Sequence, residues 1–157
     1  MLQNGPMPVV LRPALPEDFA YCRRIYFAEM KWIIEELHLD RATQETSFEQ
    51  QWDPTQVKII ALDDADIGWL QMSTRDNELF VAQMFVDRPF QRKGIGTEVM
   101  RRLIDEATEL NQPVRLNVVK INPAVRLYQR LGFQVTHEDD RKFYMKRDLN
   151  PPARSSN

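Results

Sequence analysis

The sequence has few of the residues that build disulfide frameworks and metal centres. Its 157 residues include one cysteine, Cys22, and two histidines, His38 and His137, which lie far apart. A single cysteine excludes an internal disulfide and a multi-cysteine metal site, and the histidines do not have the spacing of metal ligands. We therefore expect a protein without a metal cofactor.

A strong charge of one sign and long apolar runs are also missing. The formal net charge is only −2, with 28% charged residues, so no general basic field is available for nucleic acid. No apolar run is long enough to span a bilayer, and no secretory signal pattern is present. We expect a cytoplasmic protein that binds neither nucleic acid nor membrane.

The pattern of apolar and turn-forming residues predicts one mixed α/β domain over 9–149, with a loose N-terminus at 1–8 and a disordered tail at 150–157. An antiparallel hairpin precedes a helix that connects two neighbouring strands. The chain length suits a single compact domain. Strands are predicted at 9–12, 57–62, 67–73, 78–86, 114–118, 133–137 and 142–146, and helices at 16–39 (with a kink after Met30), 43–52, 94–110 and 123–131.

The segment Gln91-Arg92-Lys93-Gly94-Ile95-Gly96-Thr97 follows the apolar strand 78–86 and opens the helix 94–110. The first N–H groups of a helix have no intrahelical partner, and the helix dipole adds positive charge there. Gly94 and Gly96 lack a Cβ, so an anion can approach the main chain. The segment predicts a phosphate site, and a tight turn without a ligand is the alternative. Arg92, Lys93 and Thr97 can add polar contacts or face solvent.

A second segment, Asn122-Pro123-Ala124-Val125-Arg126-Leu127-Tyr128-Gln129-Arg130-Leu131-Gly132-Phe133, follows the predicted strand 114–118. Asn122 suits an N-cap, Pro123 suits the first helical position, and Gly132 suits the end of a short helix. Taken together, the sequences QRKGIG and NPAVRLYQRLGF, in this order, resemble the GNAT family of acyl-CoA-dependent N-acetyltransferases. The resemblance is clearest over 78–146 and extends more loosely to 9–18.

The resemblance implies a mixed, mostly antiparallel sheet, flanked by helices and splayed between the strands at 78–86 and 114–118. It implies that acetyl-CoA lies in this gap, with its pyrophosphate on the loop. Unpaired main-chain groups of splayed strands can bond the amides of the pantetheine arm. The cofactor-binding residues expected on this basis are Met84, Phe85, Val86, Gln91, Arg92, Lys93, Gly94, Ile95, Gly96, Thr97, Asn122, Ala124 and Tyr128.

Tyr128 is the predicted catalytic residue. The resemblance places a general-acid tyrosine here, and a phenol can protonate a leaving thiolate. A small residue at Ala124, one helical turn earlier, lets the pantetheine arm pass close to the hydroxyl. Alternatively Tyr128 packs in the core, and Asn122 only caps the helix. Glu78 is the candidate base, because some family members carry one near this place, and an exposed strand-end residue is the other reading.

The resemblance implies that the N-terminal helices form the wall for the acceptor amine. Residues 14–53 hold nine acidic and four basic residues, a net charge of −5, which attracts a cationic amine if the acidic side chains face the site. Trp32, Trp52 and Trp69 can enclose an acceptor or pack in the core. The acceptor is a small molecule or peptide with an amine, and a homodimer is left open.

The predicted function is therefore acetyl transfer from acetyl-CoA to an amine by direct attack in a ternary complex, because no motif-embedded nucleophile suggests a covalent intermediate. A non-catalytic acyl-CoA-binding or regulatory module with the same fold is the alternative. A nucleotide-binding Rossmann domain fits less well, because the glycines form GxG without a further GxxG element and the chain starts with an antiparallel hairpin.

Overall fold

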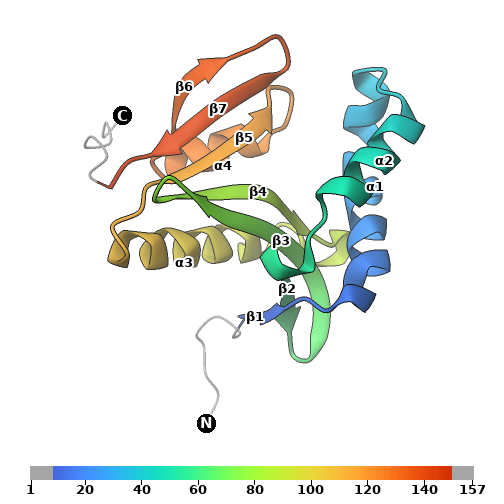
Figure 1. Ribbon diagram of the computed structural model, residues 1–157, viewed down its shortest axis with the longest axis horizontal. Coiled ribbons are helices and arrows are strands. Elements are labelled where there is room, and N and C mark those ends of the chain that lie inside the picture. Colours follow the sequence, from blue (N-terminus) through green and yellow to red (C-terminus); the bar gives the residue numbers. More distant parts are fainter. Residues whose placement is uncertain (1–8, 150–157) are drawn as a thin grey trace. The chain divides into compact units, whose positions relative to one another are not determined.

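The computed structural model describes residues 9–149 (Figure 1). The predicted loose N-terminus at 1–8 and disordered tail at 150–157 lie outside the described residues. Seven strands form a sheet in the order β1-β2-β3-β4-β5-β7-β6. The strands are β1 (Val9–Pro13), β2 (Val57–Leu62), β3 (Ala65–Arg75), β4 (Glu78–Val86), β5 (Val114–Val119), β6 (Gln134–Glu138) and β7 (Lys142–Arg147).

The helices accompany this sheet as the sequence predicts. They are α1 (Phe19–Glu36), α2 (Arg41–Gln51), α3 (Ile95–Glu109) and α4 (Ala124–Arg130), with short 3₁₀ turns at Pro16–Asp18, Pro54–Gln56 and Arg88–Phe90. The strand pair β4–β5 is parallel, and β1–β2, β2–β3, β5–β7 and β6–β7 are antiparallel. The predicted mixed, mostly antiparallel sheet flanked by helices is confirmed. Helix α1 runs from Phe19 to Glu36 without interruption, and the kink expected after Met30 stays a prediction.

The described residues group into two compact units. The first unit contains 9–71 and 84–96, and the second contains 72–83 and 97–149. Strands β3 and β4 and helix α3 therefore each run from one unit into the other.

In the first unit, the antiparallel strands β1, β2 and β3 accompany the helix pair α1 and α2. The β2–β3 turn uses Asp63 and Asp64, both with positive φ (51° and 65°), as a two-residue hairpin turn requires. The core is mainly aliphatic and aromatic, and Trp69 is fully buried between the rings of Phe48 and Phe85, with ring centroids 6.0 and 5.5 Å away. Other core members are Cys22, Ile25, Tyr26, Phe27, Ile34, Val57 and Ile59.

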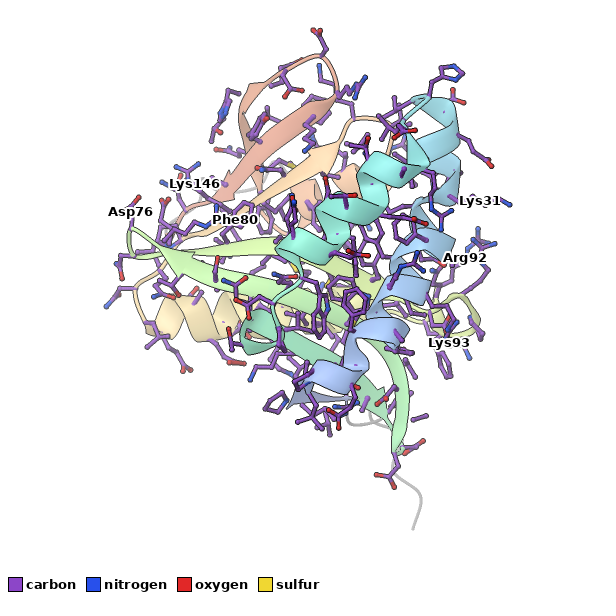
Figure 2. All side chains as sticks on the ribbon, turned by 45° about the vertical axis from the view of Figure 1, so that its right-hand side comes forward. Lys31, Asp76, Phe80, Arg92, Lys93 and Lys146 are labelled. Carbon is purple, nitrogen blue, oxygen red and sulfur yellow. The ribbon has the colours of Figure 1, made fainter. Side chains whose placement is uncertain are left out.

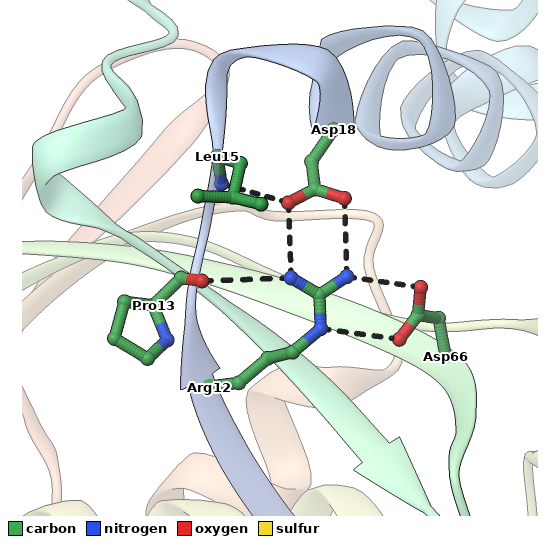
Figure 3. Close-up of polar contacts among 5 residues, drawn as sticks. All are labelled: Arg12, Pro13, Leu15, Asp18 and Asp66. Atoms are coloured by element: carbon green, nitrogen blue, oxygen red, sulfur yellow. Dashed lines mark hydrogen bonds and ion pairs between the residues drawn. The ribbon is translucent and has the colours of Figure 1, made fainter.

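An arginine ties the start of this unit together (Figure 3). Arg12 of β1 donates two hydrogen bonds to the carboxylate of Asp18, at 3.0 and 3.1 Å, and bonds Asp66 of β3 at 3.0 Å. Asp18 also accepts the main-chain N–H of Leu15 at 2.8 Å. These bonds to Arg12 lower the pKa of Asp18 and raise that of Arg12. The turn between β1 and α1 is thereby fixed to β3.

In the second unit, β5 lies between β4 and β7, and β6 and β7 form the hairpin seen beside β5 in Figure 1. The side chains alternate as in a sheet with one buried face. Val114, Leu116 and Val118 of β5 and Met145 of β7 are buried. The intervening residues of β5, β4 and β7, among them Arg115, Glu78 and Lys146, form a polar face.

Candidate functional site

The predicted phosphate loop has the backbone of an anion-binding turn. Residues Gln91–Gly94 connect the 3₁₀ turn Arg88–Phe90 to α3, which begins at Ile95. Arg92 and Gly94 both have positive φ, 63° and 79°. A Cβ added at Gly94 meets no atom within 4 Å, so the glycine serves the backbone conformation and leaves open space beside the loop.

The polar groups of this loop are available to a ligand. The side chains of Arg92 and Lys93 are exposed and are labelled in Figure 2. The first N–H groups of α3, from Ile95 onward, have no intrahelical acceptor. Gly96 is half-buried in this first turn, and a Cβ there comes no closer than 3.8 Å, to Met84 Cε. An added Cβ at either glycine thus meets no close protein atom, and pyrophosphate binding at this loop stays a prediction.

Gln91, predicted as a cofactor contact, points its amide nitrogen into the protein. Its Nε2 donates to the carbonyl of Val86 and to Glu29 Oε1 of α1, each at 2.7 Å. Glu29 lies 62 residues away in sequence, and nothing in the pattern of α1 pointed to this bond. An amide nitrogen carries two hydrogens, so both donors are used.

The main chain at the end of β4 is partly engaged inside the first unit. The carbonyl of Phe85 faces Gly68 of β3, that of Val86 accepts from Gln91, and the N–H of Asp87 bonds the carbonyl of Ile67 at 2.7 Å. The Phe85 ring packs on Tyr26 and Trp69 in the core. The expected main-chain bonds of 84–86 to pantetheine stay a prediction.

The β4–β5 ladder is short, as the predicted splay requires. Leu79–Val81 pairs with Val114–Leu116, and within the second unit no pairing of these two strands follows. The remainder of β5 continues to Val119, paired only with β7. Main-chain groups of β5 beyond Leu116 on the β4 side are therefore unused by this ladder.

Tyr128 lies near the end of the short helix α4 in the second unit. The helix begins at Ala124 with Pro123 at its N-cap, so the predicted cap at Asn122 and first helical position at Pro123 are each one residue too early. Asn122 Oδ1 still accepts the N–H of Ala124, at 2.9 Å. Gly132, with φ 98°, ends this segment. The Tyr128 ring packs edge-on against buried Phe133, with centroids 5.8 Å apart.

Burial raises the pKa of Tyr128. The phenol therefore stays protonated at neutral pH and holds a proton to donate. Within residues 9–149 its hydroxyl has no hydrogen-bond partner, so no protein group competes for that proton. The packed ring agrees with a core tyrosine, and the unbonded hydroxyl agrees with a general acid. The catalytic role of Tyr128 stays a prediction.

Glu78 is the centre of an ion cluster on the polar face of the second unit. Its carboxylate accepts from Arg115 Nε at 2.5 Å and Lys146 Nζ at 2.9 Å. Bonds to Arg115 and then to Lys146 lower the pKa of Glu78, which makes it a weaker base. These residues lie beside a cavity of about 380 Å³, whose wall includes Glu78, Phe80, Arg115 and Tyr144; Figure 2 labels Phe80 and Lys146 at this end of the unit.

Most acidic residues of the span 14–53 have structural partners. Glu45 pairs with Arg23 and Arg41 at 3.0 and 3.1 Å. Asp40 and Asp53 accept main-chain N–H groups at the starts of α2 and of a 3₁₀ turn. The arginines that pair with Glu45 are already counted in the net charge of −5, and bonds from main-chain N–H groups leave a carboxylate charged. The attraction of a cationic amine by this span stays a prediction.

The tryptophans of the expected acceptor wall differ in exposure. Trp69 belongs to the core, and only Trp32 is exposed, at 44%. Trp52 is half-buried, and its ring packs edge-on against Phe19. Trp32 is therefore the one tryptophan of the three with a large surface available to a ligand.

The described residues contain no cluster of three or more histidine, cysteine or carboxylate side chains placed to hold a metal. Among the helices at 9–149, none is both long and apolar enough to cross a bilayer. Cys22 is fully buried, and burial raises its pKa to about 12. A protonated, inaccessible thiol is not a nucleophile.

Curated relatives match about half of the chain. A spermine/spermidine N(1)-acetyltransferase of Bacillus subtilis (strain 168) is 35% identical over 69 residues, 42% of this chain and 45% of the relative. The human cysteine-rich protein 2-binding protein is 35% identical over 79 residues, 50% of this chain and 10% of that protein. The chain thus spans less than half the length of the curated relatives it matches.

Solved structures share the fold over almost the whole chain. The PaiA N-acetyltransferase from Thermoplasma acidophilum, in complex with coenzyme A, has a TM-score of 0.74 at 16% identity, covering 90% of this chain and 99% of that one. Ard1 from Thermoplasma volcanium has a TM-score of 0.62 at 21% identity, covering 88% and 96%. Residues 20–133 match the family model described as Acetyltransferase (GNAT) family. The chain belongs to the acetyltransferase (GNAT) family.

Proposed function

We propose that this protein transfers an acetyl group from acetyl-CoA to the amine of a small molecule or peptide, by direct attack in a ternary complex. The loop Gln91–Gly94 with the start of α3 carries this proposal. Its positive-φ glycine stands beside open space, and its two exposed cations flank unpaired main-chain N–H groups. These features suit phosphates.

Acetyl-CoA, when bound, supplies the acetyl thioester. The protein binds its phosphates through the N–H groups of the loop and the side chains of Arg92 and Lys93. The edge of β5 beyond Leu116 offers hydrogen-bonding groups to the pantetheine arm. Thr97, Asn122 and Ala124 stay proposed cofactor contacts, and the small side chain of Ala124, one helical turn before Tyr128, suits a pantetheine arm near the hydroxyl.

In the chemical step, the lone pair of the neutral amine forms the new C–N bond and the C–S bond breaks. The Tyr128 hydroxyl gives its proton to the departing sulfur, and the proton that the amine nitrogen loses passes through water to reprotonate the Tyr128 phenolate. Direct transfer agrees with the buried Cys22, because that thiol cannot take the acetyl group in an intermediate. We do not assign the base to Glu78, since its carboxylate is held by two cations and its pKa is lowered.

A small amine is the proposed acceptor, as the name of the spermine/spermidine acetyltransferase relative suggests. The test is release of CoA thiol from acetyl-CoA over a panel of polyamines, amino acids and peptides with free N-termini. Turnover with one class identifies the acceptor. CoA binding without turnover on any amine supports the non-catalytic module, and absence of CoA binding overturns both.

Gly96→Ala is a clean probe of the cofactor loop. The new Cβ meets only Met84 Cε at 3.8 Å, and alanine is favoured over glycine in a helix by about 1 kcal/mol, so the fold should be kept. Gly96→Val adds bulk at the same place. We expect calorimetry to show progressively weaker CoA binding from glycine to alanine to valine in proteins of unreduced stability. Equal affinities would mean that the cofactor does not bind at this loop.

A further inference from the structure

A carboxylate outside the loop holds the first residue of the loop in place. Glu29 of α1 has a side chain only 17% exposed. Its Oε1 accepts from Gln91 Nε2 at 2.7 Å, and its Oε2 lies 3.8 Å from Nε of Arg88. Both Gln91 and Arg88 belong to the connection between β4 and α3. Glu29 therefore binds this connection at two points from another element of the same unit.

The bond from Glu29 completes an anchor that starts on β4. Gln91 Nε2 also donates to the carbonyl of Val86 at 2.7 Å. The side chain of Gln91 thus spans from the last residue of β4 to the middle of α1, and its main-chain N–H bonds the carbonyl of Arg88 at 3.1 Å. A charged acceptor makes the bond to Glu29 the stronger of the two side-chain bonds.

The loop needs such an anchor because of its backbone conformation. Arg92 follows Gln91 directly and has φ 63°, a strained conformation that is uncommon for a residue with a Cβ. The side chains of Arg92 and Lys93 are exposed, so packing there does not enforce the conformation. Hydrogen bonds of the preceding residue are the remaining constraint on this side of the loop.

We infer that Glu29 is a positioning residue for the phosphate loop. It fixes Gln91, and through Gln91 the arrangement of the N–H groups of 92–94, without touching the ligand. The inference rests on the proposed function, since the loop is taken to bind the phosphates of acyl-CoA. It assigns to α1 a direct part in cofactor affinity and assigns to Gln91 a structural bond in place of a ligand contact.

Charge alone predicts the opposite result. A carboxylate near a phosphate site repels the ligand, so a purely electrostatic role means that removing it strengthens CoA binding, most of all at low salt. If Glu29 positions the loop, removing its carboxylate weakens CoA binding, because the ligand must then order the loop itself. The sign of the change in affinity separates the two.

The experiment measures CoA affinity by calorimetry in the full chain for the wild type, Glu29→Ala and Glu29→Gln. The control is Glu36→Ala, which removes an exposed carboxylate from the same helix. We expect about a tenfold weaker Kd for Glu29→Ala, the size of one charge-assisted hydrogen bond. Glu29→Gln keeps an acceptor oxygen and should lie between, and Glu36→Ala should match the wild type.

Two further readouts complete the test. In turnover assays the KM for acetyl-CoA should rise while kcat and the KM for the amine stay close to wild type. The double variant Glu29→Ala/Gln91→Ala should bind CoA no more weakly than Gln91→Ala alone, because each single change already breaks the same bond between Gln91 and Glu29. A Kd for Glu29→Ala that is unchanged or tighter overturns the inference.

Hydrogen exchange tests the anchor without any ligand. The amides of 91–94 should exchange faster in Glu29→Ala, while those of the core strand β2 stay protected. If the wild type fails to bind CoA, the proposed function fails, and the exchange result still decides whether Glu29 orders the loop. Unchanged exchange in 91–94 overturns the positioning role.

Discussion

Gly68 of β3 lies against the main chain of Phe85 in β4 so closely that a side chain has no room there. A Cβ on residue 68 would overlap the carbonyl oxygen of Phe85 and stand 3.1 Å from the Cα of Val86. Glycine inside a strand often marks such an approach of two backbones. Here the approach sets the position of the β4 segment that precedes the phosphate loop.

Gly68→Ala should therefore destabilise the protein and disturb that segment. Forcing a methyl group into a packed site costs about 1 to 3 kcal/mol, so urea unfolding should show a lower midpoint with an unchanged slope. CoA affinity should fall as well, because Val86 anchors Gln91. Gly96→Ala, where the added Cβ has space, is the matched control for stability alone, because it is itself expected to weaken CoA binding. Equal stability of Gly68→Ala and the wild type would mean that β3 and β4 separate at little cost.

The bond between Arg12 and Asp18 should appear in the pH dependence of stability. The pKa of Asp18 is lowered in the folded protein. Its contribution to the free energy of unfolding is therefore fully present above the pKa of the unfolded state, about 3.9, and is lost as pH falls through the pKa of the folded state. Asp18→Asn should cost about 1 kcal/mol near neutral pH.

Chemical denaturation at a series of pH values measures this contribution. The difference in unfolding free energy between the wild type and Asp18→Asn should shrink as pH falls below about 4, because the wild-type carboxyl then becomes neutral too. Asp140→Asn, at an exposed position without a partner in the described part of the chain, is the control. A difference that stays constant with pH would assign the effect to the turn geometry of residue 18.

Tyr128→Phe removes the hydroxyl and keeps the ring that packs on Phe133. If Tyr128 is the general acid, kcat should fall by about 10²-fold while CoA affinity stays unchanged. Because burial raises its pKa above the ordinary 10.0, wild-type activity should show no alkaline limb from this group below pH 10. Steady-state kinetics and calorimetry measure both. An unchanged kcat would make Tyr128 a packing residue.

Strand ends, turns and helix starts can be predicted from the sequence, because residues close together in the chain determine them. Strand β4 is predicted with its observed ends, Glu78 and Val86, because a turn at Asp76-Asn77 and a proline at position 89 bound its apolar run. Both turn residues have positive φ, 51° and 60°, as a tight hairpin requires. The start of α3 and the bond of Asn122 to the first turn of α4 follow from equally local signals.

The sequence does not predict contacts between distant segments. The bond from Gln91 to Glu29 depends on how α1 packs beside the end of β4, and no periodicity in α1 distinguishes Glu29 from the solvated Glu35. The pairing of Glu78 with Arg115 and Lys146 arises from strand register across three strands. Gly68 does carry a signal, a lone glycine inside an apolar strand, which indicates close backbone approach.

The ion cluster around Glu78 leads to a last prediction, on the base of the reaction. Glu78 is held by Arg115 at 2.5 Å and Lys146 at 2.9 Å, and its side chain is 21% exposed. Its lowered pKa keeps it ionised in the folded protein and makes it a poor proton acceptor at neutral pH. Glu78→Gln should therefore change kcat by less than about tenfold, below the usual contribution of a general base. The pH at which kcat/KM falls on the acid side should be the same in Glu78→Gln as in the wild type.

The same substitution should lower stability, because it leaves Arg115 and Lys146 side by side without their shared counter-ion. Thermal unfolding at neutral pH should show a lower Tm for Glu78→Gln than for Glu138→Gln, whose carboxylate bonds Lys120 from a 54% exposed position. If Glu78→Gln instead slowed turnover by about a hundredfold or more and removed the acid limb, Glu78 would be restored as the base. In that case the bound acceptor must displace Lys146 from the carboxylate, since one of its oxygens has to be free to take the proton from the amine.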